Sequence, residues 1–96
     1  MTCKIDRVVY PDASVVLHIS GRIDAADVEM LGELIERELT AQSALAMDLT
    51  EVTLVSRDAI KVLAAQETRG IELRNCPAYI RHWVSREKRR GVAETE

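Results

Sequence analysis

Ser56 is the side chain whose position in the sequence most directly suggests chemistry. It follows the apolar stretch "ALAMDL" and stands where a helical pattern begins, so its hydroxyl is a candidate nucleophile, phosphorylation site or helix cap. A nucleophilic serine needs a neighbouring base and oxyanion donors. The two histidines, His18 and His82, belong to no recognisable catalytic signature. Because serine is a favoured N-cap residue, we predict that Ser56 caps a helix and that the chain has no catalytic residues.

The cysteines and histidines do not form a metal-binding pattern. Cys3 and Cys76 lie far apart, form no CxxC motif and have no zinc-like spacing to the histidines. Cys76 precedes Pro77 near the expected start of a helix, where a thiol pKa can fall, but a buried or half-buried structural cysteine is the interpretation we adopt. The chain also has no glycine-rich phosphate-binding motif. We therefore predict no metal and no cofactor.

Composition and charge exclude several classes of partner. The chain has 96 residues, a net charge of -3 and only 3% aromatic residues, which gives little basis for binding nucleic acid. It has no run of about 18 apolar residues and no apolar N-terminal signal region. The basic segment "REKRR" is read as the solvated end of a helix. We expect no nucleic-acid partner, no membrane insertion and a cytoplasmic location.

The pattern of apolar residues predicts the elements that position Ser56. Alternation and turn residues predict strands, and apolar residues at helical spacing predict helices between them. The expected strands cover residues 3–10, 14–20, 44–49 and 71–75. The expected helices run from the cap Asp24 to residue 39, from residue 56 or 57 to 69, and from residue 77 to 87, the last of these packing Ile80, Trp83 and Val84.

These elements predict an α/β fold with the order ββαβαβα. The strand–helix–strand connection over residues 44–75 implies a parallel pair with a right-handed crossover. Polar residues recur on one side of the strands, which favours a two-layer arrangement with three helices on one face of a mixed four-stranded sheet and the other face open. We assign residues 1–88 to a single domain and residues 89–96 to a flexible C-terminal tail.

Three segments of this chain, in this order, resemble a STAS domain, the fold of anti-sigma-factor antagonists and of sulfate-transporter tails. They are "VVLHISGRIDAADVEML", "LAMDLTEVTLVSRDAIKVL" and "GIELRNCPAYIRHWV", and the resemblance spans roughly residues 4–86. In antagonists of this family the loop after the "DL" strand typically reads Asp-Ser-Ser-Gly, and its first serine is phosphorylated by an anti-sigma kinase. Here an ungapped alignment gives Ser56, Arg57, Asp58 and Ala59, so the phosphoserine motif is degenerate and Arg57 occupies its switching position.

The resemblance implies a non-enzymatic bacterial interaction module that is not switched by phosphorylation at the usual position. The expected partner is an anti-sigma or serine-kinase type of protein, a sensor protein or another STAS protein, and a homodimer is left open. Alternatives are an accessory subunit of a lipid ABC transporter and a small-molecule or nucleotide sensor with a pocket near the same loop. Ser56 remains an alternative phospho-acceptor. The expected binding surface is the 50–58 loop with the start of the second helix, near Asp24 and the start of the first helix. Its residues are Asp24, Thr53, Leu54, Val55, Ser56, Arg57 and Asp58.

Overall fold

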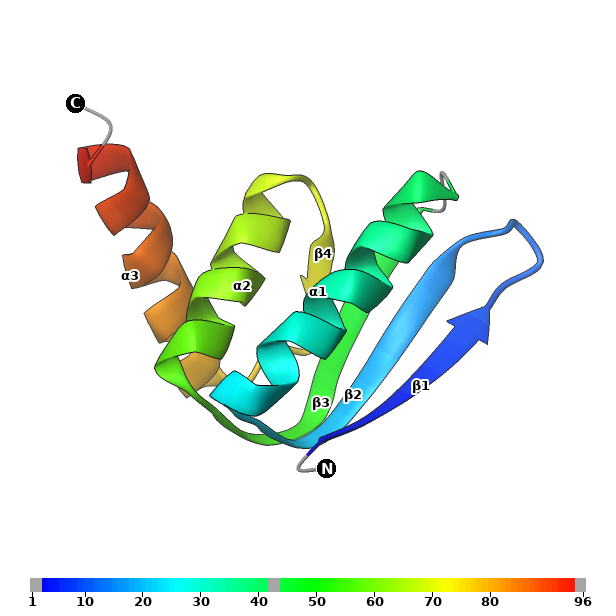
Figure 1. Ribbon diagram of the computed structural model, residues 1–96, viewed down its shortest axis with the longest axis horizontal. Helices are drawn as coiled ribbons and strands as arrows, with labels where there is room; N and C mark the ends of the chain where they lie inside the picture. The colour runs from blue at the N-terminus through cyan, green and yellow to red at the C-terminus, as the bar shows by residue number, and fades with distance from the viewer. Residues whose placement is uncertain (1–2, 42–43, 95–96) are drawn as a thin grey trace.

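The structure, a computed structural model, describes residues 3–41 and 44–94, in which strands and helices follow the order ββαβαβα (Figure 1). The strands are β1 (Cys3–Val9), β2 (Val15–Ile23), β3 (Leu45–Val55) and β4 (Glu72–Arg74), and the helices are α1 (Ala25–Thr40), α2 (Arg57–Thr68) and α3 (Ala78–Glu94). Figure 1 shows α1 lying over the sheet, with α2 and α3 following it in a row. The predicted α/β fold with a mixed four-stranded sheet is confirmed.

The sheet has the strand order β1-β2-β3-β4. β1 is antiparallel to β2, whereas the β2–β3 and β3–β4 pairs are parallel, as the predicted crossover requires. The core lies between the sheet and the helices, where apolar side chains from both layers are removed from water. Its fully buried large members are Val15, Leu17, Ile19, Ile23, Leu31, Ile35, Met47, Leu49, Leu63, Ile80 and Val84.

β3 is longer than the sequence predicted, because residues 50–55 continue the strand instead of forming a loop. The register with β2 explains the difference. Between the pairs His18–Asp48 and Ser20–Glu51, β3 contains one residue more than β2. A second register shift follows Gly21, so the alternation of buried and exposed side chains is broken twice. A strand with two such irregularities loses the two-residue period by which strands are recognised in a sequence.

β2 also runs further than predicted, to Ile23 instead of residue 20. Gly21 lies within it at φ 87°, a left-handed conformation that glycine adopts without steric cost. In the sequence this glycine reads as the end of the strand. In the structure it is a bend between the two register shifts, and the strand continues beside β3.

α3 differs from its prediction in length and in the side chains that it buries. The helix continues to Glu94, through residues 89–94 that the sequence assigned to a tail; residues 95–96 lie outside the described part. Ile80 and Val84 are fully buried, as expected, but Trp83 is 51% exposed and does not pack in the core. Residues 80 and 84 are one helical turn apart and share a face, whereas residue 83 lies beside that face.

The sheet face away from the helices carries a row of ionisable side chains that crosses all four strands. Asp6 pairs with His18, His18 with Asp48, and Asp48 with Arg74. His18 Nδ1 lies 3.6 Å from Asp48 Oδ2. Opposite charges that face each other across strands stabilise a sheet by a few tenths of a kcal/mol to about 1 kcal/mol per pair. This face is not uniformly polar, since Val16 on it is only 3% exposed.

Asp48 stabilises the first register shift of β3. Its Oδ1 accepts hydrogen bonds from the Thr50 hydroxyl at 2.6 Å and from the Thr50 N–H at 2.9 Å, and its Oδ2 accepts one from Asn75 Nδ2 at 3.2 Å. The hydroxyl of Thr50 is the main cause that lowers the pKa of Asp48, followed by the Thr50 N–H. The carboxylate thus satisfies a backbone N–H at the point where the strand pairing is irregular.

Replacing Thr50 by Val is expected to make the free energy of unfolding depend less on pH in the acid range. A carboxyl whose pKa is lowered by folding stabilises the protein above its unfolded pKa of about 3.9, and this contribution is lost as the pH falls through the folded pKa. Thr50→Val removes the hydroxyl, so the free energy of unfolding, measured with urea between pH 5 and pH 2, should fall less than in the wild type. Thr50→Ser, which keeps the hydroxyl, should behave like the wild type. Equal losses in the Val variant and the wild type would contradict the role of Thr50.

Candidate functional site

The two helix starts that the sequence singled out lie at one edge of the sheet. At the end of their parallel pairing Ile23 of β2 is opposite Val55 of β3, and the Ser56 N–H donates to the Ile23 carbonyl at 2.8 Å. Asp24 follows β2 and Ser56 follows β3, so the two N-caps stand at the same edge of the sheet. Figure 1 shows that α1 and α2 both begin there. The predicted proximity of Asp24 to the start of the second helix follows from this pairing.

Ser56 is the N-cap of α2, which confirms the prediction. Its backbone is extended, with φ −71° and ψ 166°, and its Oγ accepts a hydrogen bond from the Ala59 N–H at 3.2 Å. This geometry satisfies one of the backbone donors that the first turn of a helix leaves unpaired. The side chain is half-buried. The hydroxyl oxygen of Ser56 therefore has a structural role as the acceptor that caps α2.

Asp24 is held by its own helix start and by a neighbouring arginine. It occupies the N-cap position of α1, and its N–H donates to the Asp27 carboxylate at 3.0 Å. Its own Oδ2 lies 3.2 Å from Arg22 Nη2 in an exposed ion pair. Asp24 and Asp27 thus form a capping box at the start of α1. Asp24 remains partly exposed, and its carboxylate is paired with the Arg22 guanidinium.

The other predicted site residues divide into buried and exposed groups. Val55 packs against the core, whereas Leu54 is 51% exposed and Arg57 and Asp58 are exposed in the first turn of α2. Thr53 is exposed as well, and its carbonyl accepts a hydrogen bond from the Tyr79 hydroxyl at 2.6 Å. We call Thr53, Leu54, Arg57 and Asp58 the 53–58 edge. These four residues offer one apolar side chain beside charges of both signs.

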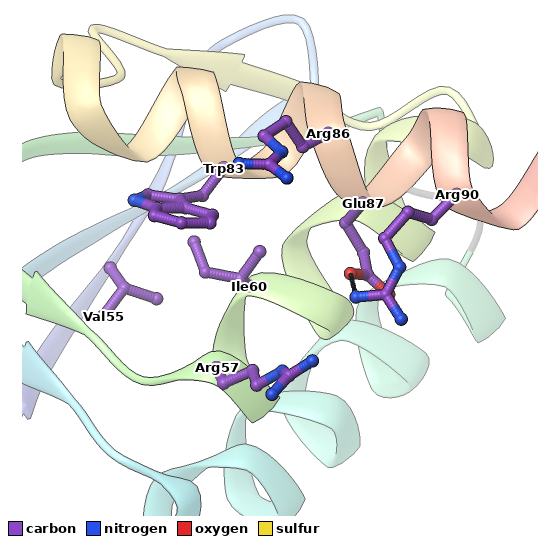
Figure 2. Close-up of a pocket in the computed structure, with 7 residues that line it drawn as sticks. All are labelled: Val55, Arg57, Ile60, Trp83, Arg86, Glu87 and Arg90. Carbon is purple, nitrogen blue, oxygen red and sulfur yellow. Dashed lines mark ion pairs between the residues drawn. The ribbon is translucent and has the colours of Figure 1, made fainter.

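A cavity lies beside the 53–58 edge, near the loop where the small-molecule alternative expected a pocket. The sequence did not identify its lining residues, because α3 supplies most of the wall of this cavity. Its volume is about 470 Å³, and Figure 2 shows side chains of β3, α2 and α3 converging on it. We call it the arginine-lined cavity; its lining residues are Val55, Arg57, Ile60, Trp83, Arg86, Glu87 and Arg90. The spacing of Trp83, Arg86, Glu87 and Arg90, three, four and seven positions along a helix, is the signal that could have placed them on one face.

Contacts within this cavity fix several of its side chains. The Arg86 guanidinium lies 5.2 Å from the centroid of the Trp83 ring, within the range of a cation–π interaction. On the same helix, Arg90 Nη1 lies 3.9 Å from Glu87 Oε2. His82 meets Trp83 edge to face at a centroid distance of 5.7 Å. The exposed tryptophan is thus surrounded by polar side chains of its own helix.

The groups that could support acid–base or thiol chemistry lie apart from Ser56. Within residues 3–41 and 44–94, no hydrogen bond joins Ser56 to a histidine: His18 pairs with Asp48 on the open face, and His82 contacts Trp83. Burial raises the pKa of the half-buried Cys76 thiol, with Glu67 adding to this and Arg81 opposing it. The suggestion that the helix start lowers the pKa of Cys76 is therefore wrong, and the structural interpretation fits.

Two further findings concern the described residues as a whole. Across residues 3–41 and 44–94, no group of three or more His, Cys, Asp or Glu side chains is arranged to hold a metal ion. In the same ranges, every helix is too short or too polar to cross a bilayer.

Ser56→Ala is expected to lower the free energy of unfolding by about 1 kcal/mol, because the Ala59 N–H loses its acceptor. Ser56→Asp should restore most of this loss, since aspartate is an equally good N-cap. The matched control is Ser85→Ala inside α3, where alanine has the higher helix propensity and no loss is expected. Urea unfolding measures all three. An unchanged Ser56→Ala variant would show that the cap contributes nothing.

Comparisons with known proteins bear on this architecture. No family model matches the chain, and no curated protein does. Among solved structures, it is similar to an uncharacterized protein of the DUF3478 family with a SpoIIAA-like fold from Shewanella loihica, with a TM-score of 0.54 and 19% identity over 72% of this chain and 60% of that one. It is also similar to an antisigma-factor antagonist STAS domain from Rhodobacter sphaeroides, with a TM-score of 0.50 and 13% identity over 76% of this chain and 84% of that one. The chain therefore has the fold of STAS domains, also called SpoIIAA-like.

Proposed function

We propose that this protein is a non-enzymatic interaction module of the anti-sigma-factor-antagonist type, and that its partner docks on the 53–58 edge together with Asp24. The observation that carries the proposal is the exposure of Leu54, 51%, at the end of a strand that is buried earlier in its course. The likeness in fold to the Rhodobacter sphaeroides antagonist supports the same class of activity. The candidate partners are an anti-sigma-type serine kinase, a sensor protein, another STAS protein or a second copy of this chain.

The chemistry of the 53–58 edge suits a protein partner. Interfaces combine an apolar centre with charged groups that set orientation and specificity. Leu54 supplies the apolar contact, and Arg57 and Asp58 supply charges of opposite sign in the first turn of α2. Arg57 makes no ion pair with any residue that the structure describes, so an acidic group of a partner can pair with it without displacing an internal contact.

The same residues favour a docking surface that is not switched by phosphate. The position at which related antagonists carry a phosphoserine is Arg57, which cannot be phosphorylated as serine is. Ser56, one residue earlier, uses its Oγ to cap α2. Asp58 already places a carboxylate in the first helical turn, where negative charge is favourable. We infer that partner binding is constitutive and is set by the side chains themselves.

Arg57→Glu is expected to weaken binding of the partner at least about tenfold, which corresponds to roughly 1.4 kcal/mol. The melting temperature should stay nearly unchanged, because Arg57 is exposed and a glutamate in the first turn of a helix is well tolerated. The measurement is calorimetric titration with the protein that co-purifies with this chain.

Two further variants complete that titration. Leu54→Ala should weaken binding without a large loss of stability, because Leu54 is half exposed. Arg37→Glu makes the same substitution in the last turn of α1, at the opposite end of that helix from Asp24, and should bind like the wild type. Equal affinities of the Arg57, Leu54 and Arg37 variants would place the docking surface elsewhere. A large fall in melting temperature for Arg57→Glu with unchanged affinity would make Arg57 structural.

Incubation with the cognate kinase and ATP is expected to leave Ser56 without stoichiometric phosphate, because its Oγ is engaged as a helix cap. Intact-mass spectrometry measures this directly. The control is a kinase substrate protein that is modified in the same reaction. A mass shift of one phosphate that disappears in Ser56→Ala would show that the switch has moved by one residue instead of having been lost.

A further inference from the structure

The arginine-lined cavity has features that the proposed protein partner does not require. Its volume of about 470 Å³ lies within the range of small-molecule sites, roughly 300–1,000 Å³. Most of its polar wall comes from α3, which is not part of the 53–58 edge. In Figure 2, Val55, Ile60 and Trp83 lie on one side of the cavity, with Arg86 beside the Trp83 ring. The other charged side chains, Arg57, Glu87 and Arg90, lie away from the ring.

The charge of the cavity is strongly positive in a chain whose net charge is -3. Three arginines line it and one acid, Glu87, lies among them. Arg90 is the arginine that Glu87 pairs with, at 3.9 Å. Arg57 makes no ion pair among the described residues, and Arg86 contacts the Trp83 ring instead of a carboxylate. Two guanidinium groups therefore face the cavity without a carboxylate partner.

The apolar side of the cavity favours a flat group. Trp83 is 51% exposed although it is the single tryptophan of the chain, and Ile60 beneath it is 8% exposed. An aromatic ring with open area binds planar apolar groups through stacking or edge contacts. Guanidinium groups bind carboxylates and phosphates through paired hydrogen bonds in one plane. The two halves of the cavity thus select for two parts of one ligand.

We propose that the arginine-lined cavity binds a small organic anion in which a carboxylate or phosphate is carried on a flat apolar body. The anionic group pairs with Arg86, the apolar body packs against Trp83 and Ile60, and Arg57 adds positive charge to the cavity. The carboxylate of Asp58 offsets the partial positive charge at the start of α2. The positive charge of the site therefore comes from the arginine side chains. The site goes beyond the proposed protein interaction, because Trp83 and Arg86 lie outside the 53–58 edge.

The single tryptophan gives a direct readout. The indole N–H of Trp83 produces one cross-peak of its kind in a proton–nitrogen correlation spectrum, and its shift at constant pH reports on binding beside the Trp83 ring. The probes are benzoate and phenyl phosphate, with benzyl alcohol as the neutral analogue and inorganic phosphate as the anion without an apolar body. The proposal expects saturable shifts with benzoate and phenyl phosphate, and affinities at least about tenfold lower for the other two probes.

Variants separate this site from the protein-docking edge. Arg86→Gln should weaken phenyl phosphate binding about tenfold or more and leave the affinity for the protein partner unchanged. Arg74→Gln removes the same charge from the open face of the sheet and should bind phenyl phosphate like the wild type. Circular dichroism confirms that both variants are folded.

Four outcomes would overturn the proposal, the last of which concerns the Arg86→Gln variant. The first is the absence of a saturable Trp83 shift with benzoate and with phenyl phosphate. The second is binding of inorganic phosphate as tight as that of phenyl phosphate, which would leave the apolar wall without a role. The third is binding of an acidic peptide such as Glu-Leu-Glu-Phe, but of neither small probe, which would make the cavity part of a protein interface. The fourth is an unchanged affinity of the Arg86→Gln variant for phenyl phosphate, which would show that Arg86 does not pair with the anionic group.

Discussion

The parallel pairing of β3 with β2 is the constraint on which the rest of the molecule depends. The last bond of this pairing, from the Ser56 N–H to the Ile23 carbonyl, fixes where both α1 and α2 begin. Two register shifts insert residues into β3 before that point, and the hydrogen bonds of the Asp48 carboxylate stabilise the first of them. The exposed Leu54 and the cap Ser56 occupy their positions because β3 is longer than its partner.

The fold could be predicted because its strands and helices carry strong local periods. The alternation in β2 up to Ser20, the apolar centre of β3 and the stripes of α1 and α2 each point to one element type. The bounds at the functional edge could not be predicted. Gly21 and the inserted residues of β3 look like turns in the sequence, and only the pairing of the two strands shows that the chain continues as a sheet.

The candidate site was predicted in part, for a related reason. Ser56 and Asp24 were identified because capping depends on residues three or four positions away, which a sequence displays directly. The cavity depends on contacts between α2 and α3, and its tryptophan was expected in the core. Ile80 and Val84 are buried one turn apart on α3. Whether Trp83, beside them, is buried or exposed then depends on the angle between α3 and α2. Single-chain periodicity contains no information about that angle.

The row Asp6, His18, Asp48 and Arg74 has a consequence for how the chain selects its strand alignment. Val15, Val16 and Leu17 are all buried, so in this part of β2 the contrast between an apolar and a polar face does not define the alignment. A slip of β1 against β2 by two residues would keep every side chain on its face. It would, however, move Asp6 from His18 to Ser20 or Val16 and break the row of polar side chains across the sheet. The polar row therefore favours the native register of β1 and β2 over registers that are shifted by two residues.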